Sequence, residues 1–291
     1  MIYLREFTYP DPVCEEKFLH GIRQTCFQSF YPFGVLSDRN PGTLELEPIT
    51  LFYGGNGSGK TTALNIIAET LHIKRSTLYN RSSFFQDYCN FCRYTLTGGE
   101  LPDGSLVITS DDVFDYLLDI RALNEGIHQK RSELFSEYTE TKYASFQMQT
   151  LDDYEELKKR NHIKAISQSA FTREHLMQNV REHSNGENAF HYFLDKIGED
   201  TLILLDEPEN SLSVERQLEL ADVIENAARF DNCQFIIATH SPFLLSLKGA
   251  RVYNWDRHPV KTQKWTELPN MRLYYEFFQK YADLFSETEN L

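Results

Sequence analysis

The sequence contains no long apolar run. The longest runs, such as Leu202 to Leu205, are far shorter than the roughly 20 residues that a membrane-spanning helix needs. Near the N-terminus, charges at Arg5 and Glu6 interrupt what would have to be the apolar core of a targeting segment. We therefore expect a cytoplasmic protein with no membrane partner.

Cysteines and basic residues are also scarce. The five cysteines cannot all pair with one another, which favours a reducing compartment. Cys89 and Cys92 form a single C-x-x-C that no second ligand pair follows, so we interpret it as structural.

The net charge of -14 argues against a general polyanion binder, because non-specific affinity for nucleic acid comes from neutralising its phosphates. The basic run from Lys158 to Lys164 is either a solvated helix face or a local nucleic-acid contact.

What the sequence does contain is a glycine-rich segment directly after the apolar run 49–53. It reads GGNGSGKTT and matches the phosphate-binding pattern G-x-x-x-x-G-K-[ST]. Small residues let the backbone wrap a polyphosphate, and the helical spacing that follows directs a helix N-terminus at the same anion. The predicted nucleotide-binding residues are Gly54, Gly55, Asn56, Gly57, Ser58, Gly59, Lys60, Thr61 and Thr62. We expect Lys60 to reach the β- and γ-phosphates and the Thr61 hydroxyl to ligate Mg²⁺.

Two further apolar runs end in residues that suit the same chemistry. Leu202 to Leu205 leads into Asp206 and Glu207, and beside a P-loop we expect Asp206 to hold Mg²⁺ through water. Glu207 would polarise the water that attacks the γ-phosphate. The run 236–238 leads to His240, which we expect at the γ-phosphate or its attacking water, because open α/β sheets deliver such residues at strand ends. The alternatives are a strand that merely ends in acids and a histidine that satisfies local backbone.

The order of these runs predicts an α/β fold. We expect an edge strand over Met1–Phe7, a helix over Glu15–Phe30, a strand within Thr43–Tyr53 and an amphipathic helix over Val214–Phe230. The last of these lies between two apolar strands, so the strand–helix–strand order implies parallel strands. The polar, proline-free stretch from about 129 to 181 predicts two or three packed helices.

Four motifs, taken in order, resemble those of the ATP-binding-cassette ATPases. More narrowly, they resemble the RecF/SMC-like soluble branch and its small predicted AAA ATPase relatives. The motifs are GGNGSGKTT at 54–62, HSNGEN at 183–188, LILLDEPENSLS at 202–213 and FIIATHSP at 235–242. The resemblance covers about two-thirds of the chain. It implies a P-loop NTPase fold of the ABC-type head, with a mostly parallel core sheet, an N-terminal antiparallel β lobe and a helical insertion.

The resemblance also implies domain bounds and further site residues. The bounds are 1–110 for the N-terminal ATP-binding lobe, 111–183 for the helical insertion, and 184–291 for the rest of the same ATPase domain. Ser184 and Gly186 match the signature motif that contacts the nucleotide of the opposite subunit, and Asn185 stands where the family usually has glycine. The predicted cross-subunit contacts are Ser184, Gly186, Glu187, Asn210 and Ser211, the last two in the D-loop at 210–213. His240 matches the switch histidine.

Two assignments are looser. Gln86 is a candidate for the glutamine that touches Mg²⁺ and the attacking water, and a plain surface glutamine is the alternative. Arg39 lies in the region where relatives approach the adenine.

Together these features predict a Mg²⁺-dependent ATPase that works as an ATP-dependent dimerisation switch. The partner subunit would be a second copy, head to tail, or a related chain. The switch would act on a nuclease or other effector, or on nucleic acid, in genome maintenance or anti-phage defence. Two alternatives remain: a nucleotide-gated binding module with negligible hydrolysis, and the ATPase subunit of a transporter. The paired acids at 111–112 and 152–153 look like helix starts, so we expect no nuclease site in this chain.

Overall fold

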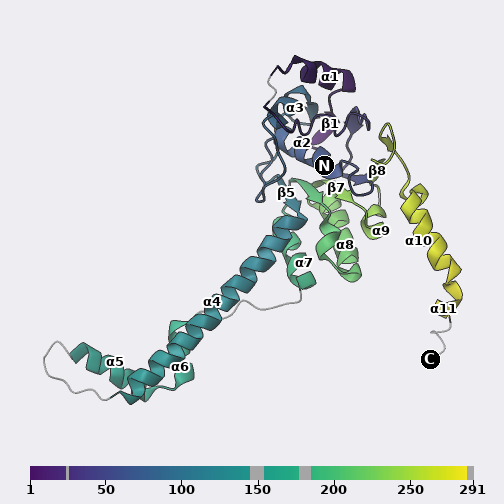
Figure 1. Cartoon of the computed structure of the whole chain (residues 1–291). Helices are drawn as coiled ribbons and strands as arrows, with labels where there is room; N and C mark the ends of the chain where they lie inside the picture. Colours follow the sequence, from purple (N-terminus) through teal and green to yellow (C-terminus); the bar gives the residue numbers. More distant parts are fainter. Residues whose placement is uncertain (24–25, 145–153, 177–184, 287–291) are drawn as a thin grey trace. The chain divides into compact units, whose positions relative to one another are not determined.

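The computed structural model describes residues 1–23, 26–144, 154–176 and 185–286 (Figure 1). The chain divides into two compact units. The first consists of Met1–Phe114 with Ala189–Leu291, and the second of Asp115–Asn188. Each is described by itself below.

A six-stranded sheet forms the centre of the first unit. Its order is β5-β6-β7-β3-β8-β9, and all neighbours are parallel except β9, which runs antiparallel to β8. The strands are β3 (Ile49–Tyr53), β5 (Leu106–Thr109), β6 (Leu202–Asp206), β7 (Gln234–Thr239), β8 (Arg251–Asn254) and β9 (Lys261–Thr262). Every residue of β3 and β7 is buried, as expected for parallel strands covered on both faces. The predicted α/β fold with a mostly parallel core sheet is confirmed.

A smaller antiparallel sheet in the same unit has the order β2-β1-β4. Its strands are β1 (Leu4–Thr8), β2 (Thr43–Glu45) and β4 (Arg93–Leu96). The expectation of an edge strand at the N-terminus was wrong, because β1 lies between the other two. Its partners come from positions about 40 and 90 residues away, and no local pattern in the sequence reveals that pairing.

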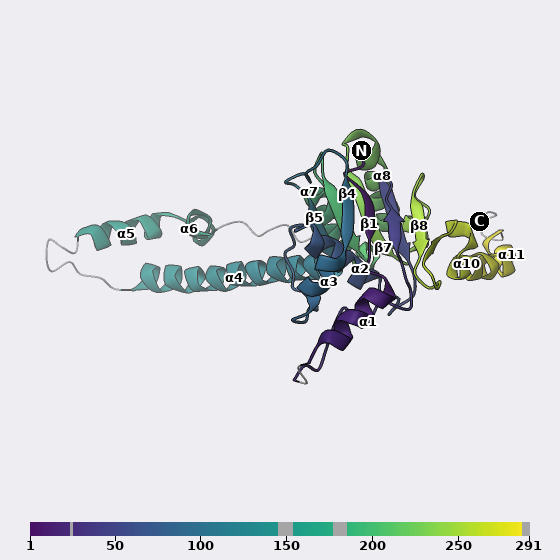
Figure 2. The same cartoon turned by 90° about the horizontal axis from the view of Figure 1, so that it is seen from above.

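Helices cover the six-stranded sheet and extend beyond it. The P-loop helix α2 (Lys60–Thr70) packs on β6 and β7, and α8 (Val214–Phe230) packs on β7, where Figure 1 shows it with α9 (Pro242–Leu245). Figure 2 shows α10 (Pro269–Lys280) and α11 (Ala282–Ser286) on the β8 side. The remaining helices of this unit are α1 (Pro12–Gly21), α3 (Phe85–Phe91) and the short 3-10 turns η2 (Pro208–Ser211) and η3 (Trp265–Glu267).

The predicted helix over Glu15–Phe30 was displaced. Helix α1 starts earlier, at Pro12, because Asp11 caps it by accepting a hydrogen bond from the backbone N–H of Cys14. The described part of the helix ends at Gly21. The helix expected over Val214–Phe230 has those bounds in the structure, with Ser213 as its N-cap.

The second unit is helical. The helices that lie in it wholly or partly are α4 (Ser110–Tyr143), α5 (Tyr154–Ala165), α6 (Gln168–His175) and α7 (Asn185–Lys196). Its core is a small cluster of Leu134, Tyr138, Ile163 and Phe171, which joins α4, α5 and α6. This agrees with the packed helices expected between 129 and 181. Among the helices that the structure describes in either unit, none has the length and apolar character to cross a membrane.

Candidate functional site

The P-loop lies between the central strand β3 and helix α2. Gly54 has no room for a side chain, since a Cβ there would lie 2.6 Å from the Ser58 Oγ. Gly59 has φ +91°, a conformation that favours glycine, and a Cβ on it would lie 2.9 Å from a Leu36 methyl group. Gly59 is the N-cap of α2 and offers no side-chain oxygen to the helix N-terminus, which therefore remains available to an anion.

Lys60 lies almost wholly inside this loop, with 4% of its surface exposed. Its Nζ donates to the carbonyl oxygens of Gly54, at 2.7 Å, and Gly55, at 3.1 Å. Its closest carboxylate is that of Glu207, with Oε1 3.8 Å from Nζ. The ammonium group therefore donates its hydrogen bonds to backbone carbonyls of the loop. A bound phosphate could replace those carbonyls as the acceptor.

Strand β6 brings its terminal carboxylate to the P-loop. The Thr61 Oγ1 donates to Asp206 Oδ1 at 3.0 Å, although 145 residues separate the two in sequence. Burial raises the pKa of the Asp206 carboxyl to about 6, while the hydrogen bond from Thr61 acts in the opposite direction. Two oxygen groups of the kind that Mg²⁺ binds are therefore adjacent at the helix N-terminus.

Glu207 follows directly, in a left-handed conformation with φ +49°. Its backbone N–H donates to the carbonyl of Ala238 in β7 at 2.9 Å, and its Oε2 accepts from Asn210 Nδ2 at 3.0 Å. Strain of this kind in a non-glycine residue is common at functional sites, where it aims a side chain. Here it turns the chain sharply into η2, which contains Asn210 and Ser211.

Strand β7 delivers Thr239, His240 and Ser241 to the same edge, since it lies between β6 and β3. These three residues are called the switch loop below, after the switch histidine that His240 is predicted to be. The His240 side chain is exposed, and its Nδ1 lies 3.1 Å from Glu209 Oε1. The structure therefore brings together Lys60, Thr61, Asp206, Glu207, Asn210 and His240 at the carboxyl ends of three adjacent strands.

The residues at this edge fit a magnesium–triphosphate group. The buried hydroxyl of Ser58 has no hydrogen-bond partner among the described residues, and the helix N-terminus beside it has no side-chain cap. Those groups are donors suited to phosphate oxygens, and the pair Thr61–Asp206 supplies oxygen ligands to a hard cation.

The remaining predicted site residues include Gln86, Ser184, Gly186 and Glu187. Gln86 is exposed on α3 and, among the residues described, has no hydrogen bond to any member of the site. Ser184 lies outside the described residues. Gly186 and Glu187 lie in the first turn of α7, where Arg121 Nη2 donates to the Asn185 side chain at 2.9 Å.

Arg39 contacts the P-loop itself. Its guanidinium donates to the carbonyl of Gly57 at 3.1 Å and to that of Trp255 at 2.6 Å. Asp256 holds the opposite side of the loop, because its carboxylate accepts from the Gly55 N–H at 3.0 and 3.2 Å. No motif in the sequence points to Asp256, which lies 201 residues after its partner Gly55. Glu209 was missed as well, because its partner Thr239 lies 30 residues further along the chain in another strand.

Cys89 is buried and Cys92 half-buried, both as free thiols. Burial raises the pKa of the Cys89 thiol to about 11 and that of Cys92 further. Both are therefore neutral at physiological pH, which does not suit a reactive thiolate.

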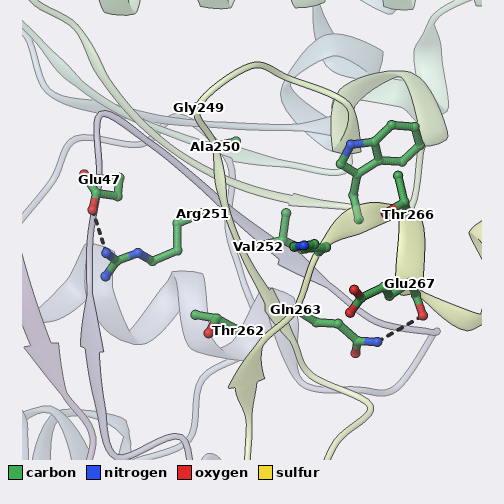
Figure 3. Close-up of a pocket in the computed structure, with 11 residues that line it drawn as sticks. Glu47, Gly249, Ala250, Arg251, Val252, Thr262, Gln263, Thr266 and Glu267 are labelled. Carbon is green, nitrogen blue, oxygen red and sulfur yellow. Dashed lines mark hydrogen bonds and ion pairs between the residues drawn. The ribbon is translucent and has the colours of Figure 1, made fainter.

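Two of the open pockets in the described part of the chain adjoin the six-stranded sheet. One, of about 610 Å³, adjoins the switch loop and is lined by Glu209, Asn210, Gln217, His240 and Ser241 together with aromatic residues of α10. Figure 3 shows the other, of about 700 Å³, around the start of β8. Its Arg251 is paired with Glu47 Oε1 at 2.6 Å and Glu45 Oε2 at 2.8 Å. That charge is already compensated, and we assign no chemistry to this second pocket.

Comparison with known proteins gives one family match. The family described as "AAA domain, putative AbiEii toxin, Type IV TA system" matches residues 192–246, which include β6, η2, α8 and β7. No curated protein matches the chain.

Solved structures of similar fold are distant. The Smc head domain of Pyrococcus furiosus, solved with an extended coiled coil and bound to the C-terminal domain of ScpA, is 13% identical with a TM-score of 0.45. That match covers 95% of this chain and 100% of the other. The SMC head domain of Thermotoga maritima is 13% identical with a TM-score of 0.39, and covers 90% and 99%. An inward-facing "putative metal-chelate type ABC transporter" is 16% identical with a TM-score of 0.36, and covers 78% and 76%. TM-scores below 0.5 are too low to support a functional assignment.

The order of the four motifs, the strand order of the sheet and the family match agree with one another. The predicted resemblance to P-loop ATPases is thereby supported over residues 192–246, which are similar to the AAA domain family.

Proposed function

We propose that the protein binds and hydrolyses ATP with Mg²⁺ at the edge formed by the P-loop, β6 and β7. The observation that carries this proposal is the contact of Thr61 with Asp206, next to Lys60 and Glu207. The P-loop amides and Lys60 hold the phosphates, and Thr61 and Asp206 hold the cation. Bound Mg²⁺ supplies charge neutralisation at the phosphates. Glu207 accepts the proton of the attacking water, and His240 hydrogen-bonds the γ-phosphate or that water.

We further propose that ATP closes two subunits head to tail. The signature residues Ser184, Gly186 and Glu187, with Asn210 and Ser211, would contact the nucleotide held by the partner subunit. ATP stabilises the closed pair only through its differential affinity for that state, and the signature contacts provide the difference. Hydrolysis then releases the pair, and an effector or a nucleic acid reads the change.

The role in genome maintenance or anti-phage defence rests on the resemblance. The description of the matched family, which names a toxin of a type IV TA system, is compatible with a defence role. The exposed His240 and the strained Glu207 favour hydrolysis over the alternative of a purely nucleotide-gated module.

Light scattering of Glu207→Gln with ATP and Mg²⁺ tests the proposal. We expect the mass of a dimer with ATP and of a monomer without it. The matched control is Glu207→Gln with Ser184→Arg, in which the added side chain blocks the partner's nucleotide but leaves the P-loop intact. This double variant should bind ATP and stay monomeric. A Glu207→Gln protein that binds ATP and remains monomeric contradicts the dimerisation switch, and one that does not bind ATP contradicts the nucleotide site.

A further inference from the structure

A buried carboxylate lies between the catalytic edge and the switch loop. Glu209, in the turn η2, has 6% of its surface exposed. Removing a carboxylate from water is costly unless hydrogen bonds compensate it. Among the described residues, the hydrogen-bond donors to this carboxylate are Thr239, at the end of β7, and His240 and Ser241, which follow it.

The described hydrogen bonds to the Glu209 carboxylate converge on one oxygen. Oε1 accepts from Thr239 Oγ1 at 2.7 Å, from the His240 N–H at 2.7 Å and from the Ser241 N–H at 3.2 Å. The same oxygen lies 3.1 Å from His240 Nδ1. The other oxygen, Oε2, is buried with no hydrogen-bond partner in the described part of the chain. The carboxylate therefore holds the backbone of the switch loop by hydrogen bonds and lies beside the ring of its histidine.

The turn that carries Glu209 is also bonded to the catalytic edge. The next residue, Asn210, donates to Glu207 Oε2 at 3.0 Å. Gln217 of α8 ties the turn to the switch loop a second time, because its Nε2 donates to the carbonyl of Leu212 at 3.0 Å while its Oε1 accepts from Ser241 Oγ at 2.7 Å. A displacement of η2 thus moves the groups around Glu207 and around His240 together.

We propose that Glu209 is a positioning residue for His240. A carboxylate oxygen accepts hydrogen bonds, so its position 3.1 Å from Nδ1 favours the ring tautomer that carries its proton on Nδ1 over the one that carries it on Nε2. The opposite ring nitrogen, Nε2, is then without a proton and can accept a hydrogen bond from a ligand such as the attacking water. The link to catalysis rests on the proposed function, whereas the effect on the histidine ring exists in the protein without nucleotide.

The first test is nitrogen NMR of the histidine rings in the nucleotide-free protein. The chain has nine histidines, and His240→Gln identifies the signal of interest. Wild type should show a protonated Nδ1 on His240. Glu209→Ala should shift this signal toward the mixture of tautomers found in free imidazole, and Glu215→Gln, which changes an exposed acid of α8, should leave it unchanged.

The second test is steady-state hydrolysis with the same variants. Glu209→Ala should lower kcat about tenfold, with the KM for ATP and the calorimetric affinity for ATP unchanged, because the P-loop is untouched. Glu209→Gln keeps an acceptor oxygen for the loop amides and should recover part of kcat. If Glu209→Ala does not fold, Glu209→Gln serves as the test variant in both measurements, with a smaller expected change.

The outcomes separate this inference from the proposed function. An unaltered His240 signal in the variant contradicts the inference even if the protein hydrolyses ATP. A shifted signal supports the tautomer role even in a protein found not to hydrolyse ATP, a result that overturns the proposed function instead. A shifted signal with unchanged kcat contradicts the link to catalysis.

Discussion

The two ends of strand β7 carry buried polar networks of opposite character. At the amino end, Gln234 is fully buried and uses both of its polar atoms: Oε1 accepts from the N–H groups of Tyr3 and Leu4, at 2.8 Å each, and Nε2 donates to the carbonyls of Leu4 and Glu47, at 2.8 and 3.2 Å. At the carboxyl end, polar groups remain available: His240 is exposed, and the Ser58 hydroxyl nearby on the P-loop has no partner among the described residues.

We infer that the network at the amino end of β7 serves stability, whereas the network at its carboxyl end serves function. The amino-end network joins the small sheet to the large one and leaves nothing for a ligand to bind. The carboxyl-end network holds its groups in place through Glu209 and Asn210 while leaving donors and acceptors free. Loss of the first should unfold the protein, and loss of the second should inactivate a folded one.

The largest expected effect is that of Lys60→Ala at the carboxyl end. Removing one partner of a buried charge contact costs about 4 kcal/mol, close to 10³-fold in the Kd for ATP. Calorimetry measures this, and an unchanged melting temperature shows that the loss is local. An affinity equal to wild type would remove Lys60 from the site.

Gln234→Met should give the opposite result. The side chain has similar volume but leaves the Tyr3 and Leu4 backbone groups unsatisfied, which should cost roughly 3 kcal/mol of stability. Denaturant unfolding measures it, with Gln279→Met at an exposed position of α10 as the control. At a temperature where the variant is folded, its affinity for ATP should match wild type. A large loss of affinity for ATP in the folded variant would contradict the view that the amino end of β7 contributes to stability alone.

Glu207→Gln should retain ATP binding and slow hydrolysis at least about 10²-fold, the scale of a lost general base. Single-turnover kinetics separates this step from product release. The matched control is Glu215→Gln, which changes an exposed acid nearby. Turnover at the wild-type rate would show that another group activates the water.

The smallest effect concerns Asp206 and pH. Its pKa in the folded protein, about 6, exceeds its usual value of 3.8, so between these values the folded state binds more protons than the unfolded one. Metal-free stability should therefore fall as the pH rises through this window. Asp206→Asn should be more stable than wild type by roughly 3 kcal/mol at pH 8 with EDTA, and equal to it near pH 3, below both pKa values. A difference that does not change with pH would rule out this ionisation as the cause.

The sequence alone was sufficient to predict those candidate site residues that belong to short contiguous motifs. Gly54 to Thr62 and Asp206–Glu207 are read from residues adjacent in the chain, and parallel strands bring their ends to one edge. Partners set by distant pairing were not predictable: Gln234 with Tyr3, Asp256 with Gly55, and β1 between β2 and β4. In the sequence, Glu209 is one of several acidic residues that follow an apolar run. Its burial depends on the pairing of β6 with β7, which brings the residues after the two strands together.

The most direct measurement is a structure of the protein with Mg²⁺ and a non-hydrolysable ATP analogue. It reports the distance from Ser184 to the γ-phosphate held by the other subunit. The account predicts two chains closed head to tail, with Ser184 and Gly186 within hydrogen-bond distance of the partner's nucleotide and with Thr61 and Asp206 at the cation. A nucleotide-filled P-loop whose γ-phosphate is met only by residues of its own chain would contradict it.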